Sequence, residues 1–261
     1  MYFDTALKVI SRFRFALATS LVAVLVAGCA HNPLATWVTS ENHEARRAVL
    51  VVIHATQQRS VEASLDTLRS RNPDGRVSAH YLIGRDGRIY QLVRERRRAW
   101  HAGGGRWGTI TDLNSASIGI ELDNDGASDY PDAQVDALLR LLEDVCTRLE
   151  IPRTQVIGHA DLAPWRKTDP GARFPWRRLA EAGFGRWPEP AALSLPVPAD
   201  FQPWVALQLL GYPMRDPQAA LRAFRLHFRG IDDASSPMGE EDRALLHALV
   251  AKEWSVRPPA Q

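Results

Sequence analysis

Residues 48–54 restrict the fold of this chain more than any other segment. They read Ala-Val-Leu-Val-Val-Ile-His, so six apolar residues precede a single histidine. A strand without polar residues has to be covered on both faces, as happens in sheets that carry helices on each side. The chain is therefore predicted to form an α/β domain around a central sheet.

Strands and helices are expected to alternate from there to residue 187. Apolar residues at 132–149 recur with helical spacing, and Asp132 is expected to cap that helix. The turn Gly84-Arg85-Asp86-Gly87 favours a hairpin between its flanking strands. The expected elements after residue 54 are a helix from Ser60, strands at 77–83, 88–93 and 117–122, the helix at 132–149, and a strand at 154–158. This order predicts a mixed central β-sheet flanked by helices, in a domain over residues 47–187.

Five prolines between residues 188 and 203 separate this domain from the rest of the chain. Proline restricts the backbone and interrupts both helices and ladders, so residues 188–202 are predicted to be a linker. Beyond it, apolar residues recur with helical spacing around Leu207, Phe224 and Leu246. A small C-terminal three-helix domain is predicted over residues 203–256.

The N-terminus has the composition of a targeting signal. Lys8, Arg12 and Arg14 precede the apolar residues 15–27, a stretch too short to span a bilayer comfortably. Removal of this segment during export is the interpretation that we adopt, and a retained membrane helix is an alternative.

Leu-Val-Ala-Gly-Cys at 25–29 resembles a bacterial lipobox, in which the cysteine is lipidated and becomes the first mature residue. Residues 1–28 are then a lipoprotein signal peptide, Cys29 carries the lipid that anchors the protein to a membrane, and residues 29–46 form a tether. The expected location is the periplasm, with the anchor in the outer membrane, and Ala30 is compatible with that sorting. An ordinary signal peptide cut near by is the alternative.

Charge gives no sign of a nucleic-acid partner. The predicted signal peptide holds three of the 32 basic residues and one of the 30 acidic residues, so 29 of each remain and the formal net charge of the mature chain is zero. The arginine-rich run at 94–98 is interpreted as a solvated face. Cys146 is the remaining thiol, which excludes a disulfide framework, and it is expected to be buried and inert.

Two histidines, His54 and His159, each end a predicted buried strand. Loops at strand ends can hold metal ligands rigidly, although a lone histidine there is commonly structural. His159 opens a loop that contains Asp161, Lys167 and Asp169. A catalytic zinc site takes three protein ligands and leaves the fourth position for water, and two histidines with one aspartate satisfy that number. Zinc would lower the pKa of the water to about 7.

Glu121 lies within the strand predicted at 117–122. Alternation places Ser117, Gly119 and Glu121 on one face, and the small residues beside Glu121 are expected to leave open space above the sheet. An unpaired carboxylate there is costly, so a role as general base and later proton donor is one interpretation. A structural salt bridge to an arginine is the other.

Four motifs resemble the type-2 N-acetylmuramoyl-L-alanine amidase family, especially its lipoprotein and anhydro-muropeptide-cleaving branch. The similarity covers roughly residues 43–187. The motifs are Val-Ile-His at 52–54; Ser-Ala-His-Tyr-Leu-Ile at 78–83; Ala-Trp-His-Ala-Gly at 99–103 with Asn-Ser-Ala-Ser-Ile-Gly-Ile-Glu-Leu at 114–122; and the loop 159–171 with Phe-Pro-Trp at 174–176.

The resemblance implies Zn²⁺ as cofactor, with His54, His159 and Asp169 as its ligands. It implies that Glu121 is catalytic and that Lys167 stabilises the developing oxyanion. The implied reaction is hydrolysis of the amide bond between (anhydro-)N-acetylmuramic acid and L-alanine, with peptidoglycan and muropeptides as binding partners and no protein partner. More distant relatives carry a tyrosine where this chain has Ala79, and Glu121 is expected to take the role of that tyrosine.

Trp100, His101 and Asn114 are the candidate substrate-binding residues. For Asn114, hydrogen bonding within the scaffold is the stronger interpretation, whereas Trp100 and His101 lie beside Gly103-Gly104-Gly105 and suit contact with sugar or peptide. The segment from 203 resembles a peptidoglycan-binding helical module, and whether it binds the wall or packs on the catalytic domain stays open.

Two other functions are compatible with parts of this pattern. Some members of the wider fold bind muropeptides without cleaving them after losing a zinc ligand, so a non-catalytic peptidoglycan receptor is one alternative. A zinc peptidase that cuts within the stem peptide is the other.

Overall fold

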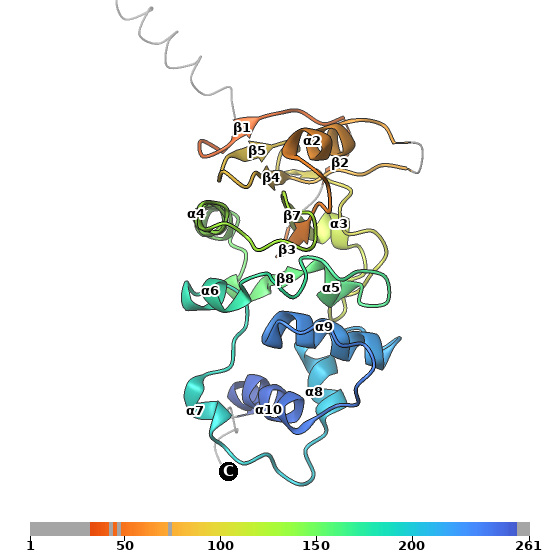
Figure 1. Ribbon diagram of the computed structural model, residues 1–261, viewed down its shortest axis with the longest axis vertical. Coiled ribbons are helices and arrows are strands. Elements are labelled where there is room, and N and C mark those ends of the chain that lie inside the picture. Colours follow the sequence, from red (N-terminus) through yellow and green to blue (C-terminus); the bar gives the residue numbers. More distant parts are fainter. Residues whose placement is uncertain (1–31, 42–43, 46–47, 73–74, 255–261) are drawn as a thin grey trace, which may run out of the picture. The chain divides into compact units, whose positions relative to one another are not determined.

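The computed structural model describes residues 32–41, 44–45, 48–72 and 75–254, and residues from Leu34 onward belong to one compact unit (Figure 1). The predicted signal peptide and Cys29 lie outside the described residues. Within the described ranges, no helix is both long enough and apolar enough to cross a membrane.

The central sheet has six strands, and most neighbouring pairs are parallel. β4 and β5 form the one antiparallel pair, around the predicted Gly84–Gly87 turn, and both are shorter than expected. The order across the sheet is β1 (Thr36–Trp37), β5 (Ile89–Gln91), β4 (Tyr81–Ile83), β7 (Ser117–Leu122), β3 (Leu50–Ala55) and β8 (Val156–Gly158). The mixed α/β architecture predicted from the sequence is therefore confirmed.

Short strands also occur within the predicted tether. β1 pairs with β5 at the edge of the main sheet, and β2 (Glu44–Ala45) pairs antiparallel with β6 (Arg97–Arg98). Two-residue strands leave no recognisable pattern in a sequence, because alternation needs a longer run to be seen.

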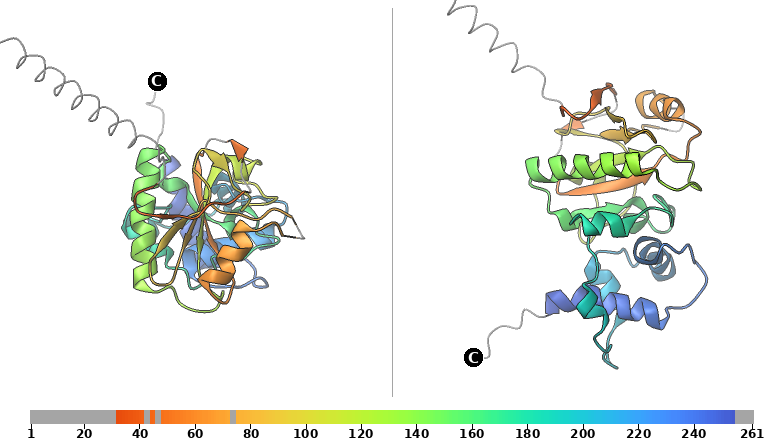
Figure 2. Two further views of the ribbon diagram at one scale, coloured as in Figure 1. Left: turned by 90° about the horizontal axis from the view of Figure 1, so that it is seen from above. Right: turned by 60° about the vertical axis from the view of Figure 1, so that its left-hand side comes forward.

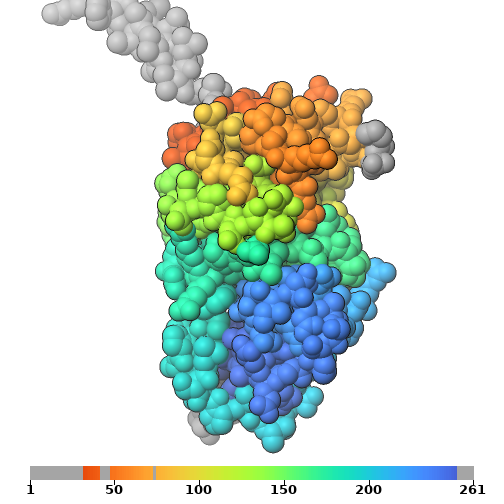
Figure 3. All heavy atoms as spheres, viewed as in Figure 1, coloured from red at the N-terminus to blue at the C-terminus, as the bar shows by residue number. Residues whose placement is uncertain are grey.

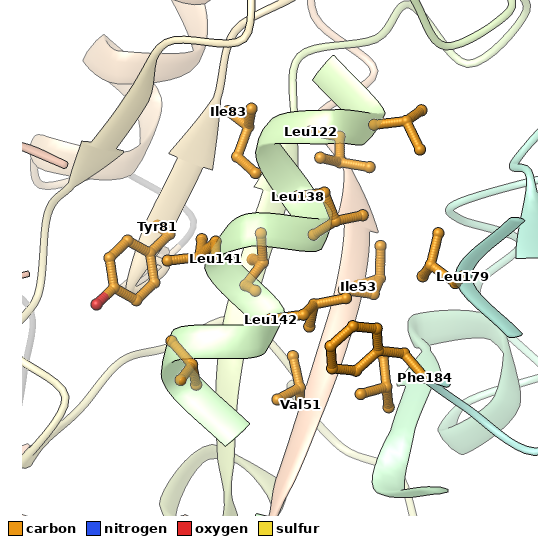
Figure 4. Close-up of a cluster of buried hydrophobic side chains, with 14 of the residues drawn as sticks. Val51, Ile53, Tyr81, Ile83, Leu122, Leu138, Leu141, Leu142, Leu179 and Phe184 are labelled. Atoms are coloured by element: carbon orange, nitrogen blue, oxygen red, sulfur yellow. The ribbon is translucent and has the colours of Figure 1, made fainter. Parts of the chain in front are cut away.

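One face of the sheet is covered by α4 (Asp132–Arg148) and α6 (Trp176–Glu181). Figure 2 shows α4 lying along the sheet, and Figure 4 shows Leu138, Leu141 and Leu142 of this helix packed over Val51 and Ile53. Each of these leucines is fully buried, which stabilises the fold by about 1.5–3 kcal/mol per side chain. The helix starts one residue earlier than predicted, because Pro131 occupies the cap position and Asp132 is the first helical residue.

The opposite face carries α2 (Val61–Arg69), α3 (Leu113–Ala116), α5 (His159–Leu162) and the loop 99–112. The helix predicted from Ser60 is present, with Ser60 as its N-cap, and the Ser60 side chain accepts a hydrogen bond from the backbone N–H of Ala63. A 3₁₀ turn, η1 (Arg153–Gln155), replaces the first half of the strand expected at 154–158. Cys146 of α4 is a buried free thiol, so its predicted burial is confirmed, and burial raises its pKa to about 11.

The C-terminal segment forms α8 (Pro203–Leu210), α9 (Pro217–Arg229) and α10 (Glu240–Trp254), preceded by the short α7 (Pro190–Leu193) in the predicted linker. The three predicted helices share one apolar cluster, which also includes Ala160 of α5. Figure 3 shows the blue residues of α9 packed directly against the teal segment of α6. We call α8, α9 and α10 the C-terminal module.

Candidate metal centre and active site

Three parallel strands bring the candidate residues to one edge of the sheet. β7 and β8 flank β3, and in the register of the β3–β7 pair His54 lies directly opposite Glu121. β8 ends at Gly158, so His159 emerges beside His54 at the carboxyl end of the sheet. Since the carboxyl ends of parallel strands meet at one edge, residues far apart in the sequence come together there.

The side chains of His54, His159 and Asp169 form a compact buried group. The Nδ1 atoms of the two histidines are 2.9 Å apart, and Oδ2 of Asp169 lies 3.4 Å from Nδ1 of His54 and 3.1 Å from Nδ1 of His159. Ligands at the usual zinc distances, placed tetrahedrally, are separated by about 3.3 Å. The two nitrogens and one oxygen therefore fit a zinc ion in both chemistry and spacing.

The charge states of these groups suit metal binding. Burial lowers the pKa of His54 to about 4, and the neighbouring His159 adds to this effect, so the imidazole is neutral at physiological pH. Burial alone would raise the pKa of Asp169, but His159 and His54 hold it below its usual range. Neutral imidazoles and an ionised carboxylate are the forms that bind metal.

A chain of hydrogen bonds fixes which nitrogen of His54 carries the proton. The Ser117 hydroxyl donates to the carbonyl of Leu113 at 2.5 Å, so its oxygen is left to accept from Nε2 of His101 at 3.3 Å. Nδ1 of His101 then accepts from Nε2 of His54 at 2.9 Å. Nδ1 of His54, which faces the cluster, is consequently unprotonated and available to a metal.

His159 is oriented by the backbone of the loop 99–112, which also contains His101. Nε2 of His159 lies 3.1 Å from the carbonyl of Ala102 and 3.3 Å from a guanidinium nitrogen of Arg166. In the tautomer in which Nε2 donates to that carbonyl, Nδ1 is unprotonated and can bind a metal. Oδ1 of Asn114 accepts from the backbone N–H groups of His101 and Ala102, at 3.0 and 2.8 Å. Asn114 thus holds the two residues that orient both histidines, and outer contacts of this kind tune metal ligands.

Gly119 makes room for the His101 ring. A Cβ atom at position 119 would lie 2.4 Å from the ring, a distance that real structures do not tolerate. The space that the small residues of β7 were expected to leave above the sheet is therefore filled by His101. His80 lies near by, 5.7 Å from His101 between ring centroids, and its Nδ1 accepts from the Gly119 N–H, which gives it a scaffold role.

Glu121 is buried beside the cluster, and no arginine among the described residues forms a salt bridge with it. Its Oε1 lies 4.0 Å from Nδ1 of His54, and within the described chain its buried Oε2 has no hydrogen-bond partner. Burial raises the pKa of Glu121 to about 8, Asp169 adds to the rise, and the charge of Lys167 opposes it. A buried carboxylate with an unsatisfied oxygen can hold and pass on a proton.

Two basic residues of the 159–171 loop act on this centre in different ways. Lys167 is half-buried, and its charge also lowers the pKa of His54, after the larger effects of burial and the neighbouring charges. Arg166 donates to the carbonyls of Gly104 and Ala102. Neither Arg166 nor the Ala102 carbonyl was among the predicted site residues, and a backbone acceptor leaves no trace in residue type.

Trp100 is separate from this network. Two guanidinium groups lie over its indole, with Arg98 4.2 Å and Arg76 5.4 Å from the ring centroid, and the side chain is half-buried. Such stacking holds the ring in place and leaves part of it accessible. The structure thus gathers His54, His159, Asp169, Glu121, His101 and Asn114, with Lys167 at the margin and Trp100 beyond it.

Comparison with known proteins identifies the family of the chain. The family model for N-acetylmuramoyl-L-alanine amidase matches residues 44–172. The chain is 35% identical to the N-acetylmuramoyl-L-alanine amidase AmiD of Escherichia coli, over 88% of this chain and 95% of that protein. It is 45% identical to the 1,6-anhydro-N-acetylmuramyl-L-alanine amidase AmpD of Citrobacter freundii, over 40% of this chain and 56% of that protein.

Two solved structures resemble the whole fold. E. coli AmiD in complex with anhydro-N-acetylmuramic acid-L-Ala-D-γ-Glu-L-Lys has a TM-score of 0.69 at 32% identity, covering 85% of this chain and 93% of that one. AmpDh3 of Pseudomonas aeruginosa has the same TM-score and identity, covering 86% and 98%. The chain therefore belongs to the N-acetylmuramoyl-L-alanine amidase family, whose members hydrolyse the amide bond between N-acetylmuramic acid and L-alanine.

Proposed function

We propose that this chain is a zinc-dependent amidase of the bacterial cell envelope, with His54, His159 and Asp169 as the zinc ligands. The observation that carries the proposal is the convergence of these three ligand atoms beside Glu121, a buried carboxylate with an unsatisfied oxygen. A bound zinc ion would act as a Lewis acid on the scissile carbonyl and on the attacking water.

The side chains around the metal position supply the remaining chemistry. Oε2 of Glu121 accepts a proton from the attacking water and later delivers it to the departing alanine nitrogen, and a pKa of about 8 suits exchange in both directions near neutral pH. The ammonium of Lys167 offsets negative charge as it develops on the carbonyl oxygen. Both groups act in a site from which burial excludes most water.

The substrate that we propose contains muramic acid with an attached peptide. Support comes from two relatives of known structure, since AmiD is in complex with an anhydro-muramic tripeptide and AmpDh3 with an anhydromuramic pentapeptide. Of the three predicted substrate residues, Trp100 keeps part of its side chain accessible for contact with the sugar or the peptide. The hydrogen bonds of His101 and Asn114 favour orientation of the zinc ligands over direct contact.

The support for the cellular location of the protein comes from its sequence alone. We propose that Cys29 carries the lipid, that residues 1–28 are removed, and that the mature enzyme is anchored in the periplasm, at the outer membrane. Mass spectrometry of the protein purified from membranes would reveal an acylated N-terminal cysteine. If a Cys29→Ser variant were still acylated and recovered with the membranes, Cys29 would not be the site of the lipid anchor.

The test of the activity is mass spectrometry of defined muropeptides incubated with the whole chain in mild detergent. We expect intact stem peptide beginning at L-alanine to be released with zinc present and lost with a chelator. Asp169→Ala should also abolish release, whereas Asp66→Ala, at an exposed position of α2, should leave it unchanged. Fragments cut within the stem would point to a peptidase. Bound muropeptide without cleavage by the zinc-loaded chain would point to a receptor.

A further inference from the structure

The C-terminal module reaches the metal-binding loop through one buried carboxylate, that of Asp161. Its Oδ1 accepts from the Tyr212 hydroxyl at 2.7 Å, and its Oδ2 accepts from Nδ1 of His227 at 2.8 Å. The backbone N–H of Gly158 also donates to Oδ2, at 2.7 Å. Tyr212 follows α8 and His227 lies on α9, so two of these three donors belong to the module.

Burial makes these hydrogen bonds important. The residue Asp161 is 1% exposed, and a buried carboxylate is costly unless donors compensate for the lost water. The donor from its own segment, the Gly158 N–H, engages Oδ2 alone. Within the described chain, the hydrogen bond to Oδ1 of Asp161 therefore comes from the module, through the Tyr212 hydroxyl.

Asp161 is directly connected to the candidate zinc ligands. It is the third residue of α5, whose first residue is His159, and it binds the N–H of Gly158, the residue just before that histidine. The N–H of Ala160, between them, donates to the backbone carbonyl of Asp169 at 2.8 Å. A shift of Asp161 would thus move His159 and Asp169, and with them two of the three ligand atoms.

The two donors are themselves held rigidly. The ring of His227 stacks on that of Trp176, with centroids 3.8 Å apart and an angle of 10° between planes. The ring of Tyr212 packs edge-on against Trp107 at 5.3 Å and is buried. Since neither ring can turn freely, both can impose a position on the carboxylate between them.

We propose that Tyr212 and His227 are positioning residues of the amidase, which act through Asp161 to hold His159 and Asp169 in the arrangement that binds zinc. The C-terminal module is then part of the active-site scaffold. This inference rests on the proposed zinc site. The alternative is that the module only stabilises the fold. In that case, any substitution that destabilises the module would lower zinc affinity equally.

The test compares variants that remove a donor with one that only weakens the module. Tyr212→Phe deletes the hydroxyl, and His227→Phe keeps a ring to stack on Trp176 but deletes the Nδ1 donor. His227→Asn places an amide donor near the position of Nδ1 and serves as the rescue variant. Leu246→Ala removes a fully buried leucine of α10 and no donor to Asp161, and it is the stability control.

Zinc affinity of the whole chain is measured by competition with a chromogenic chelator, together with melting temperature, kcat and KM on an anhydro-muropeptide. Direct outer contacts of metal ligands are worth about 10–100-fold in affinity, so one step further out we expect a loss of about three- to tenfold for Tyr212→Phe and His227→Phe. The value of kcat should fall in parallel with little change in KM. His227→Asn should recover most of the affinity, and Leu246→Ala should lower only the melting temperature.

Two outcomes would overturn the inference: unchanged zinc affinity in both donor deletions, or an equal loss of affinity in Leu246→Ala. All comparisons are made below the melting temperature of the least stable variant, and a donor deletion that does not fold leaves the other to decide. A wild-type chain that binds no zinc would instead defeat the proposed function.

Discussion

Glu121 is a residue whose burial works against stability. A carboxylate that is taken out of water without enough hydrogen bonds destabilises a fold by several kcal/mol, and Oε2 of Glu121 has no partner in the described chain. The adjacent positions on its strand face are a glycine and a serine that accommodate His101. Such a group persists where it serves a reaction, since stability and activity place opposite demands on it.

Replacement of Glu121 by Gln is expected to separate catalysis from metal binding. The amide keeps the shape of the side chain but cannot take up a proton, so kcat should fall by about 10²–10⁴-fold. Bound zinc, measured by elemental analysis, should stay near one per chain. Glu62→Gln, at an exposed position of α2, is the matched control and should behave like the wild type. Loss of zinc in the Glu121 variant would show that this residue is a ligand.

Asn114 is expected to matter for zinc although it contacts no ligand directly. Asn114→Ala leaves the N–H groups of His101 and Ala102 without their acceptor and loosens both histidines, so zinc affinity should fall by about 10–100-fold. Asn124→Ala is the control, because Asn124 is also buried and holds a loop, through Gly126 and Ser128. Equal zinc affinities in the two variants, measured by chelator competition, would contradict the positioning role.

At the scale of the elements, strand β7 shows how far the sequence predicts the site. Its bounds and the common face of Ser117, Gly119 and Glu121 follow from alternation, and the structure confirms them. Alternation does not predict which residues cover that face. The ring above Gly119 belongs to His101, which comes from a loop without periodicity. Local pattern determines which way a strand faces, whereas the loop that covers it depends on tertiary packing.

Gly119→Ala tests this close packing of strand and loop. The added methyl group would meet the His101 ring and push it away from His54, so both zinc affinity and kcat should fall, by about tenfold or more. Gly104→Ala is the control, since a Cβ atom there meets nothing within 4 Å and the position does not need a positive φ. Equal zinc affinity and equal kcat in the two alanine variants would mean that the His101 ring does not pack against Gly119.

At the scale of the whole molecule, the C-terminal module depends on a buried ion pair between α9 and α10. Asp242 is fully buried, and its carboxylate accepts from Arg225 at 2.7 Å and from Arg229 at 2.7 Å. Arg225 also donates to the carbonyls of Ser236 and Pro237, so the pair fixes the loop between the two helices. The sequence predicted the three helices but not this pair, because charge partners distant in sequence leave no local pattern.

This pair predicts how the stability of the molecule depends on pH. Burial acts to raise the pKa of Asp242, but hydrogen bonds from Arg225, the Gly239 N–H and Arg229 outweigh it and lower that pKa below its usual value. A lowered pKa contributes stability that is complete above the unfolded value of about 3.9 and is lost as the pH falls through the folded value. Asp242 should therefore stabilise the protein at pH 5–7 and lose this effect below about pH 4.

Urea denaturation of the zinc-free chain between pH 7 and pH 3 measures this contribution, because metal loss in acid then plays no part. Asp242→Asn leaves Arg225 buried without its partner and should lower the free energy of unfolding by about 3 kcal/mol at pH 7. The difference from wild type should shrink as the pH falls below about 4, where the wild-type carboxylate also becomes neutral. Asp136→Asn breaks an exposed pair with Arg178 and should cost less than about 1 kcal/mol at pH 7. A difference between wild type and Asp242→Asn that stays constant down to pH 3 would mean that folding does not lower the pKa of Asp242, and that its charge adds nothing to the packing of α9 on α10.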